Sequence, residues 1–228
     1  TRSYSVTRVQ TCALPIFRDF FSSTRTTVWG KRKGFFGRGN FAETTPYVNR
    51  IISDAILYNE IPSPTENEEL RAGFIARRLT EFGISNVTTD EAGNVRVLFP
   101  GSKPSDEYVL FFAEIENDSY SPLDSLVRLT GDRAVGAGIA DNSVGVASLL
   151  VLAEYLQNHS VRYDTNLVLL FTRLASGKEE FAGLRRFLSG WDGKIAFAVY
   201  VTGIQLGNIE TNPLGHYKLT VKIGRAHV

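Results

Sequence analysis

The chain contains 228 residues, 43% of them hydrophobic and 21% charged, and its formal net charge is +1. This length and composition predict a soluble globular protein with a sizeable core, and no apolar run approaches the length of a typical membrane span. The only cysteine is Cys12, so a disulfide framework and a cysteine-ligated zinc site are excluded within the sequence given. A reducing, cytoplasmic location is compatible with this cysteine usage.

Both ends of the chain contain segments that resemble translated sequencing adapter. VTRVQTCALPI, residues 6–16, differs from one such translation only at Arg8, and IGRAHV, residues 223–228, resembles the opposite adapter. The chain also contains no methionine. We therefore expect residues 1–16 and 223–228 to be non-native, and they are left out of the fold prediction.

A basic segment rich in aromatic residues follows at residues 17–40. It contains six Lys or Arg and one Asp, and runs of this kind can bind nucleic acid. Because it lacks helical or strand periodicity, we expect a disordered leader and no nucleic-acid partner. The remaining body, residues 41–222, is acidic, with 16 Lys and Arg against 23 Asp and Glu.

The regular pattern begins after residue 40. In TTPYVNRIISDAILYN, residues 44–59, apolar side chains recur at helical spacing until Pro62 interrupts the pattern. This spacing predicts a first helix that ends before Pro62. Its expected buried stripe consists of Val48, Ile51, Ile52, Ala55 and Ile56.

A second helix is predicted to begin at SPTE, residues 63–66. Ser63 would be the N-cap, Pro64 the first helical residue, and Glu66 the acidic member of a capping box. Gly83 suits the left-handed conformation that often ends a helix. The apolar positions expected to be buried between these limits are Leu70, Phe74, Ile75 and Leu79.

Strands and helices alternate over the rest of the body. Residues 86–101 predict two short strands about a turn at 92–94. Uninterrupted apolar runs predict strands that are buried on both faces, as in parallel sheets. These strands are expected at 109–113, 166–171 and 195–201, with helices at 143–157 and 179–189. The alternation predicts an α/β layer fold.

Two glutamates follow the first buried strand of this series. Ligands of an open α/β sheet gather beyond the carboxyl ends of its strands, and Glu114 and Glu116 occupy such a position. Strand alternation would place both side chains on the same side. The alternative interpretation is a solvated strand end with a turn at Asn117 and Asp118, because most carboxylates are exposed.

Other carboxylates lie at predicted helix starts. Asp141 precedes the 143–157 helix in GIADNSVG, where it is either a metal ligand or an ordinary N-cap. Glu179 and Glu180 would lie in the first turn of their helix, where the helix dipole favours acidic residues. The turn VTGIQLGNIE, residues 201–210, is a weak phosphate-loop candidate because it lacks the lysine and the helix start.

The order of these pieces resembles the di-zinc exopeptidase family that includes peptidase T, carboxypeptidase G and succinyl-diaminopimelate desuccinylase. NEIPSPTENEEL and DEAGNVRV are similar to its opening helix pair and the strands after it, and GIADN is similar to its bridging-metal motif. The resemblance spans about residues 45–222 and implies a three-layer α/β/α catalytic domain with a mixed sheet at 41–214. It also implies that the alternating residues 215–222 begin a second α+β domain, the lid or dimerisation domain.

The resemblance assigns a role to each matched position. Asp141 would be the metal-bridging aspartate. Glu114 stands where the family has a metal-binding histidine, and Glu116 stands where it has the supporting aspartate. The first strand end therefore departs from the family pattern.

The later ligand positions also differ from the family. An ungapped comparison places Ala175 and Ser176 at the family's Glu-Glu pair, whereas a short insertion would place Glu179 and Glu180 there. The ungapped comparison fits the downstream residues better. Thr202 stands where the family has its last acidic ligand. Only Asp141 matches unchanged.

Two function classes follow from this comparison. The leading hypothesis is a homologue of zinc peptidases or amidohydrolases whose metal site has been largely lost, with a binding or structural role. The alternative is an active exopeptidase that hydrolyses small peptides or N-acyl amino acids, with Asp141, Glu114 and Glu180 as metal ligands and Glu179 and Glu116 in catalysis. Zinc is the family's cofactor, and a carboxylate-only site would instead suit a hard divalent cation or none.

The resemblance also implies partners. Peptides or acylated amino acids are the expected substrates of an active protein, and the second domain would support a homodimer. No membrane partner is expected.

Overall fold

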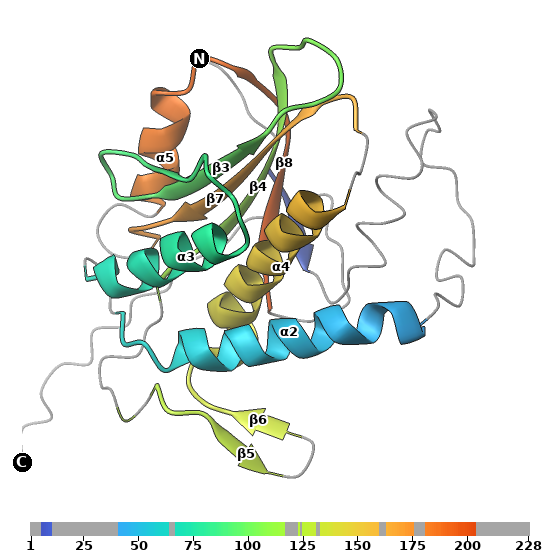
Figure 1. The fold of residues 1–228 in the computed structure, drawn as a ribbon. Coiled ribbons are helices and arrows are strands. Elements are labelled where there is room, and N and C mark those ends of the chain that lie inside the picture. The colour runs from blue at the N-terminus through green and yellow to red at the C-terminus, as the bar shows by residue number, and fades with distance from the viewer. Residues whose placement is uncertain are drawn as a thin grey trace, which may run out of the picture.

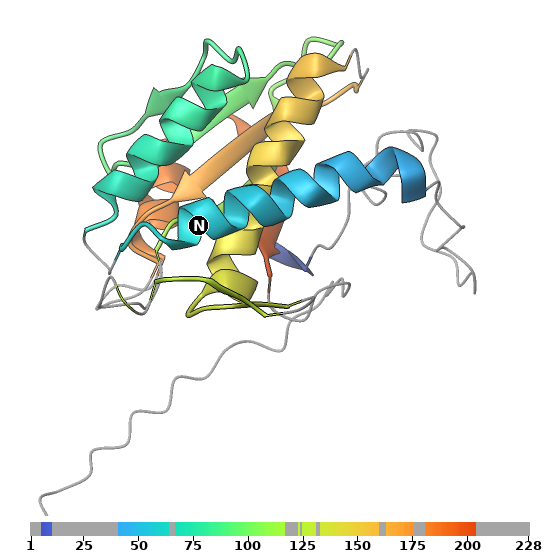
Figure 2. The ribbon, with the colours of Figure 1, turned by 60° about the horizontal axis from the view of Figure 1, so that its bottom comes forward.

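The structure is a computed structural model in which the chain forms three layers (Figure 1). A six-stranded mixed sheet lies in the middle. Helices α2, α3 and α4 cover one face and α5 covers the other (Figures 1 and 2). This confirms the predicted three-layer α/β/α fold class. The described residues are 6–10, 41–63, 67–116, 123, 125–130, 133–159, 163–175 and 181–203.

The sheet has the strand order β1-β8-β4-β7-β3-β2. The central strand β4 runs parallel to both β7 and β8, whereas β3 is antiparallel to β7 and β2 is antiparallel to β3. The strands are β1 Val6–Gln10, β2 Thr88–Thr89, β3 Val95–Phe99, β4 Glu107–Glu114, β7 Asn166–Thr172 and β8 Lys194–Thr202.

The predicted strands 109–113, 166–171 and 195–201 are confirmed as β4, β7 and β8. Alternate side chains of β4 enter two different cores, as the pleat requires. Phe111 and Ala113 pack under α3 and α4, while Leu110 and Phe112 pack toward α5. All four are buried. The apolar run therefore predicted a strand covered on both faces correctly.

The predicted first helix is confirmed as α2, Phe41–Asn59, which ends before Pro62 and contains Pro46. Its predicted buried stripe is partly wrong, because Ile52 is 48% exposed. Tyr58 and Asp54 are fully buried instead. Tyr58 donates a hydrogen bond to a carbonyl after β4, and Asp54 forms an ion pair with Arg78 of α3. Asp54 and Tyr58 keep the helical spacing of Ile51 and Ala55, so they continue the same stripe. Helical spacing does not indicate their hydrogen-bond and ion-pair partners, which come from other elements.

Helix α3, Glu69–Glu81, begins later than predicted. The proposed capping box is therefore wrong: the N-cap is Glu68, without a side-chain cap hydrogen bond, and Pro64 and Glu66 lie outside the described residues. Leu70, expected in the core, is 70% exposed, while Arg71 is fully buried. Gly83 has φ +81° just beyond the helix, as predicted.

Helices α4, Val144–Asn158, and α5, Ala182–Ser189, follow the predicted pattern, although α5 begins three residues later than residue 179. A short π-helical turn, η1 Ile139–Ser143, leads into α4. Ile139–Asn158 is long and apolar enough for a membrane span, but 67% of its most apolar window is buried inside the protein. This segment comprises η1 and α4, and α4 lies in the same helical layer as α2 and α3 (Figure 2).

Two strand pairings were absent from the sequence prediction. Residues 6–10, excluded as adapter-like, pair with the outer edge of β8 as a parallel strand. An open sheet edge offers unpaired backbone groups to any extended segment. A separate hairpin, β5 Arg128–Thr130 and β6 Arg133–Val135, lies below α2 (Figure 1). The basic leader and the predicted second domain lie outside the described residues.

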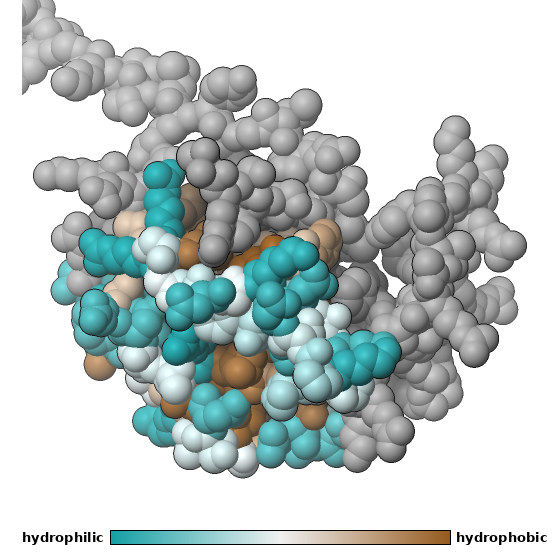
Figure 3. All heavy atoms as spheres, turned by 90° about the horizontal axis from the view of Figure 1, so that it is seen from above, coloured by the Kyte–Doolittle hydropathy of each residue, from teal (hydrophilic) through white to brown (hydrophobic). Residues whose placement is uncertain are grey.

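The end of the molecule where α5 leads into β8 is mixed in character. Seen from above, hydrophilic side chains surround a few apolar ones (Figure 3). Lys194 forms an ion pair with Glu107 there, and Trp191 packs edge-on against Tyr108. The predicted site lies at the opposite end of the parallel strands.

Candidate functional site

The carboxyl ends of β4, β7 and β8 lie at one edge of the sheet, where the sequence predicted a site. Glu114, the last residue of β4, is aligned with Thr172, the last residue of β7. Thr202 is the last residue of β8. The turn η1 reaches this edge, since Gly203 donates a backbone hydrogen bond of 3.0 Å to the carbonyl of Asp141.

Glu114 is partly buried among other carboxylates. Burial is the main cause that raises its pKa to about 7, and the charges of Glu116 and Asp141 raise it further. Hydrogen bonds from Tyr200 and Asn142 act in the opposite direction. The contact from Asn142 Nδ2 to Glu114 Oε2 is long, at 3.4 Å. The structure thus brings together three of the predicted residues as an acidic edge: Glu114, Glu116 and Asp141.

Asp141 does not cap α4, so the N-cap interpretation is wrong. Its backbone is non-helical, with φ −121° and ψ −112°. Its Oδ1 accepts a hydrogen bond of 2.9 Å from the Thr202 hydroxyl. The close approach of the two segments requires Gly203, because an added Cβ would lie 2.5 Å from the carbonyl oxygen of Ala140. Thr202 is therefore a partner of Asp141 that lies 61 residues away in the chain.

Glu116 is 2% exposed, which contradicts a solvated strand end at this residue, while the turn considered at Asn117 and Asp118 lies outside the described residues. The backbone beside it is held from several directions. The Ile115 carbonyl accepts hydrogen bonds from Tyr58 Oη at 2.7 Å and Arg71 Nη1 at 3.1 Å. The Glu116 carbonyl accepts one from Asn142 Nδ2 at 2.9 Å. Side chains beneath the sheet edge thus fix the chain between the two glutamates.

Arg71 is the buried cation that the sequence analysis missed. In addition to the hydrogen bond to the Ile115 carbonyl, the Arg71 guanidinium donates hydrogen bonds to the carbonyls of Ile61 at 2.6 Å and Asn59 at 3.2 Å. Its guanidinium carbon lies 4.5 Å from the centre of the Tyr58 ring. Burial lowers its pKa, while interactions with Tyr58 oppose that change. Arg71 shares the buried face of α3 with Ile75 and Leu79, so helical spacing placed it toward the core, but its charge gave no indication that it would be buried.

Glu179 and Glu180, the remaining predicted site residues, lie outside the described residues, as does Ser176. The ends of this segment are described. Ala175 is buried, and its carbonyl accepts a hydrogen bond of 2.9 Å from the Phe181 backbone. The described chain therefore does not decide between the two comparisons of this region.

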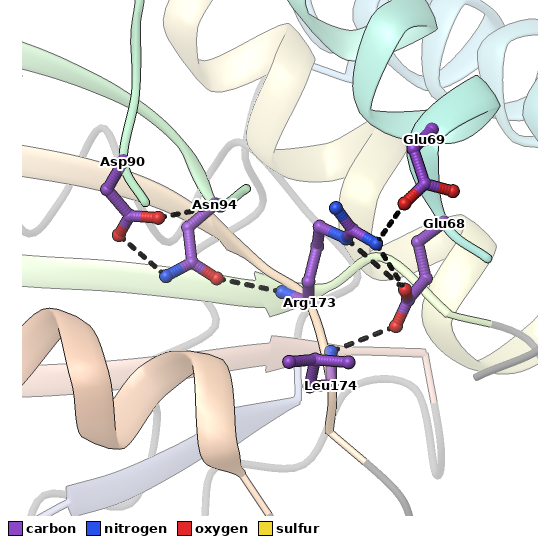
Figure 4. Close-up of polar contacts among 6 residues, drawn as sticks. All are labelled: Glu68, Glu69, Asp90, Asn94, Arg173 and Leu174. Carbon is purple, nitrogen blue, oxygen red and sulfur yellow. Dashed lines mark hydrogen bonds and ion pairs between the residues drawn. The ribbon is translucent and has the colours of Figure 1, made fainter. Parts of the chain in front are cut away.

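A second polar cluster surrounds the end of β7 (Figure 4). Glu68 Oε2 accepts hydrogen bonds from Arg173 Nε at 3.2 Å and Nη2 at 3.0 Å. Its Oε1 accepts one from the Leu174 backbone at 2.9 Å. Asn94 Oδ1 accepts from the Arg173 backbone at 2.9 Å, and Asp90 orients Asn94 through a further bond of 2.7 Å. The sequence analysis did not single out these residues.

The described side chains provide a limited set of metal ligands. Within the described residues there is no group of three or more His, Cys, Asp or Glu side chains arranged to hold a metal ion. Zinc sites in proteins generally use imidazole or thiolate ligands, and the acidic edge presents carboxylates. Thr202 and Asn142 direct hydrogen-bond donors at two of them. The described residues thus do not fit a dinuclear zinc centre.

Comparisons with known proteins agree with the fold. Residues 94–189 match the model of Peptidase family M28, and a search of curated proteins found no match. The chain resembles human carnosine dipeptidase 1, with a TM-score of 0.53 and 12% identity over 67% of this chain and 38% of that one. It also resembles the Bacillus subtilis YXEP protein, a dinuclear metal binding peptidase from the M20 family, with a TM-score of 0.50 and 18% identity over 68% and 43% of the two chains.

The resemblance of the chain to zinc peptidases of the M20 and M28 type is thereby confirmed. At these identities the solved structures establish the fold, which is that of a zinc exopeptidase catalytic domain. The chain spans less than half the length of either of these two structures, 38% and 43%.

Proposed function

We propose that the protein is a homologue of zinc peptidases and amidohydrolases in which the metal site has been largely lost, and that it has a binding or structural role. The observation that carries this proposal is the hydrogen bond from Thr202 to Asp141. The resemblance places an acidic metal ligand at residue 202. The Thr202 hydroxyl found there donates a hydrogen bond to Asp141 instead of coordinating a cation. Asp141, the one ligand position that matches the family unchanged, therefore accepts a hydrogen bond from the protein itself.

The remaining positions support the same proposal. Glu114 replaces the expected histidine, and its pKa of about 7 favours a protonated carboxyl below neutral pH. A protonated carboxyl is a poor ligand, because metal ligands bind in the deprotonated form. Ala175 offers no ligand atom in its side chain. A cytoplasmic location and a homodimer through a second domain are part of the proposal by resemblance.

The alternative is an active hydrolase of small peptides or N-acyl amino acids with a carboxylate-rich site. The gathering of Glu114, Glu116 and Asp141 favours it, since the latter two charges act on the first. Hard cations such as Mg²⁺, Mn²⁺ or Ca²⁺ accept oxygen-only ligands. In this version Asp141, Glu114 and Glu180 hold the ion, Glu179 takes a proton from water, and Glu116 supports the site.

Metal stoichiometry tests the two versions. The chain is incubated with Zn²⁺, Mn²⁺ or Co²⁺, passed through a desalting column and analysed for bound metal, with Asp141→Asn as the matched control. We expect retention near zero in both proteins. About two ions per chain, as in a dinuclear peptidase, and their loss in the control would overturn the proposal. Calorimetry with Mg²⁺, Mn²⁺ and Ca²⁺ covers the hard-cation version, which requires saturable binding that Asp141→Asn abolishes.

A further inference from the structure

The chain leaves β7 through a leucine in a left-handed conformation. Leu174 has φ +56°, a region that is unfavourable for a residue with a Cβ. It lies two residues beyond Thr172, which is aligned with Glu114 at the acidic edge. Backbone strain of this kind persists only where the surrounding structure enforces it. The contacts of Leu174 therefore identify what enforces it.

The backbone N–H and the carbonyl of Leu174 both form hydrogen bonds. The N–H donates to Glu68 Oε1 at 2.9 Å, and the carbonyl accepts from the Ala182 N–H at 3.0 Å. The next carbonyl, that of Ala175, accepts from the Phe181 N–H. The preceding N–H, that of Arg173, donates to Asn94. Consecutive peptide groups after β7 are thus fixed by contacts from different parts of the chain.

Glu68 is the side chain among these partners that binds Leu174 itself. It is fully buried and lies at the start of α3, where an acidic side chain could instead cap the helix. It makes no such cap. Its carboxylate reaches the end of β7, 106 residues away in sequence, with one oxygen on Leu174 and the other on Arg173 (Figure 4).

We infer that Glu68 is a positioning residue: its hydrogen bond to the Leu174 N–H imposes the left-handed backbone there and so sets the direction in which the chain leaves β7 beside the acidic edge. The alternative is that Glu68 only neutralises Arg173. This inference goes beyond the proposed function, and it holds whether or not the acidic edge binds a metal.

The preference of residue 174 for glycine over alanine separates the two roles. Glycine adopts left-handed backbone without the steric cost that alanine incurs, whereas alanine is favoured in ordinary conformations. Leu174→Gly and Leu174→Ala are made in the wild-type chain, in Glu68→Gln, which keeps an acceptor oxygen for the Leu174 N–H, and in Glu68→Met, which has no oxygen. Urea titration of each gives the equilibrium constant for unfolding.

In the wild-type chain the glycine variant should have a smaller unfolding constant than the alanine variant by roughly 5- to 30-fold. The preference should persist in Glu68→Gln and should disappear or reverse in Glu68→Met. As a control, Gly73→Ala in α3, where an added Cβ meets no atom within 4 Å, should stabilise all three backgrounds alike. An undiminished glycine preference in Glu68→Met, or none in the wild type, would overturn the inference.

A second measurement applies if the Glu68→Met proteins do not fold. Amide hydrogen exchange of Leu174 is compared with that of Phe171 in β7, in the wild-type and Glu68→Gln chains. The inference expects slow exchange of both amides in both proteins, because the acceptor remains. Exchange of the Leu174 amide as fast as that of an exposed loop would overturn it.

Discussion

A fully buried carboxylate, Glu68, and a partly buried one, Glu114, have opposite surroundings at the same edge of the sheet. Glu68, beside the end of β7, is paired with the guanidinium of Arg173. Burial lowers the pKa of Arg173, but hydrogen bonds to Glu68 and Glu69 more than offset this and raise it. Glu114, at the end of β4, lies near two other carboxylates, and its own pKa is raised to about 7.

The difference shows that burial alone does not decide what a carboxylate does. A buried charge is tolerated where a counter-charge and hydrogen bonds replace water, and it tends to become neutral where they do not. The Glu68 site is therefore suited to holding a backbone in place. The acidic edge is suited to exchanging a proton or, in the alternative proposal, a cation.

The largest effect is expected when Arg173 is removed, because Glu68 then resembles Glu114. Arg173→Leu leaves a fully buried carboxylate without its ion-pair partner, and we expect a loss of about 3 kcal/mol or more in the free energy of unfolding at pH 7. The loss should shrink at pH 5, where the carboxyl can take up a proton. Urea unfolding at the two pH values measures both changes.

A matched control and a double variant sharpen that result. Arg185→Leu changes an exposed arginine of α5 and should alter stability by less than about 0.5 kcal/mol. Adding Glu68→Gln to Arg173→Leu removes the unpaired charge and should recover part of the loss. Equal losses at both pH values, with no recovery in the double variant, would show that the Arg173 alkyl chain matters more than its charge.

The second prediction concerns the pH dependence caused by Glu114. Its pKa is about 7 in the folded protein and 4.5 for an unperturbed glutamate. Between these pH values the folded protein keeps a proton that the unfolded chain has released, so stability falls as the pH rises through this window and levels off above it. We expect a loss of about 2 kcal/mol between pH 5 and pH 8, below the full value of the shift because the edge is partly solvated.

Glu114→Gln isolates this contribution from those of other titrating groups. The variant cannot release a proton at this position, so its stability should fall less than that of the wild type over the same pH range. Urea unfolding at pH 5, 6, 7 and 8 gives the two curves. Parallel curves would mean that Glu114 titrates near its ordinary value, and the acidic edge would then be more solvated than the structure indicates.

The sequence predicted the acidic edge and the strands that carry it, whereas it did not single out Glu68 and Arg173. The apolar runs of β4, β7 and β8 were sufficient to predict their strands. For β7 and most of β4 the reason is that a strand buried on both faces has little choice of composition. The carboxyl end of β4 then indicated Glu114 and Glu116, and the predicted helix start in GIADN indicated Asp141. These predictions depend on patterns within a few residues and on one general rule of α/β sheets.

The parts that failed depend on partners distant in sequence. Asp141 satisfied the local rule for an N-cap, but its partner is Thr202. SPTE satisfied the rule for a capping box, but the helix begins at Glu69. Arg71 was not among the residues expected to be buried in α3, yet it donates hydrogen bonds to three carbonyls from two other segments. Local spacing carries no information about such contacts, and they decide how the site edge is built.

The smallest effect is expected at Glu69, which tests whether burial makes Glu68 different. Both glutamates contact Arg173 Nη2, and the contact of Glu69 is the shorter, at 2.5 Å against 3.0 Å. Glu69 is 65% exposed and Glu68 is fully buried. Exposed ion pairs contribute little, so Glu69→Gln should cost less than about 0.5 kcal/mol. Glu68→Gln should cost about 2 kcal/mol.

Urea unfolding of the two variants at low and high salt completes the test. Salt screens exposed pairs more than buried ones, so any small cost of Glu69→Gln should vanish at about 1 M salt while most of the cost of Glu68→Gln remains. Equal costs for the two substitutions would contradict the comparison. Burial would then not distinguish what the two carboxylates contribute at the end of β7.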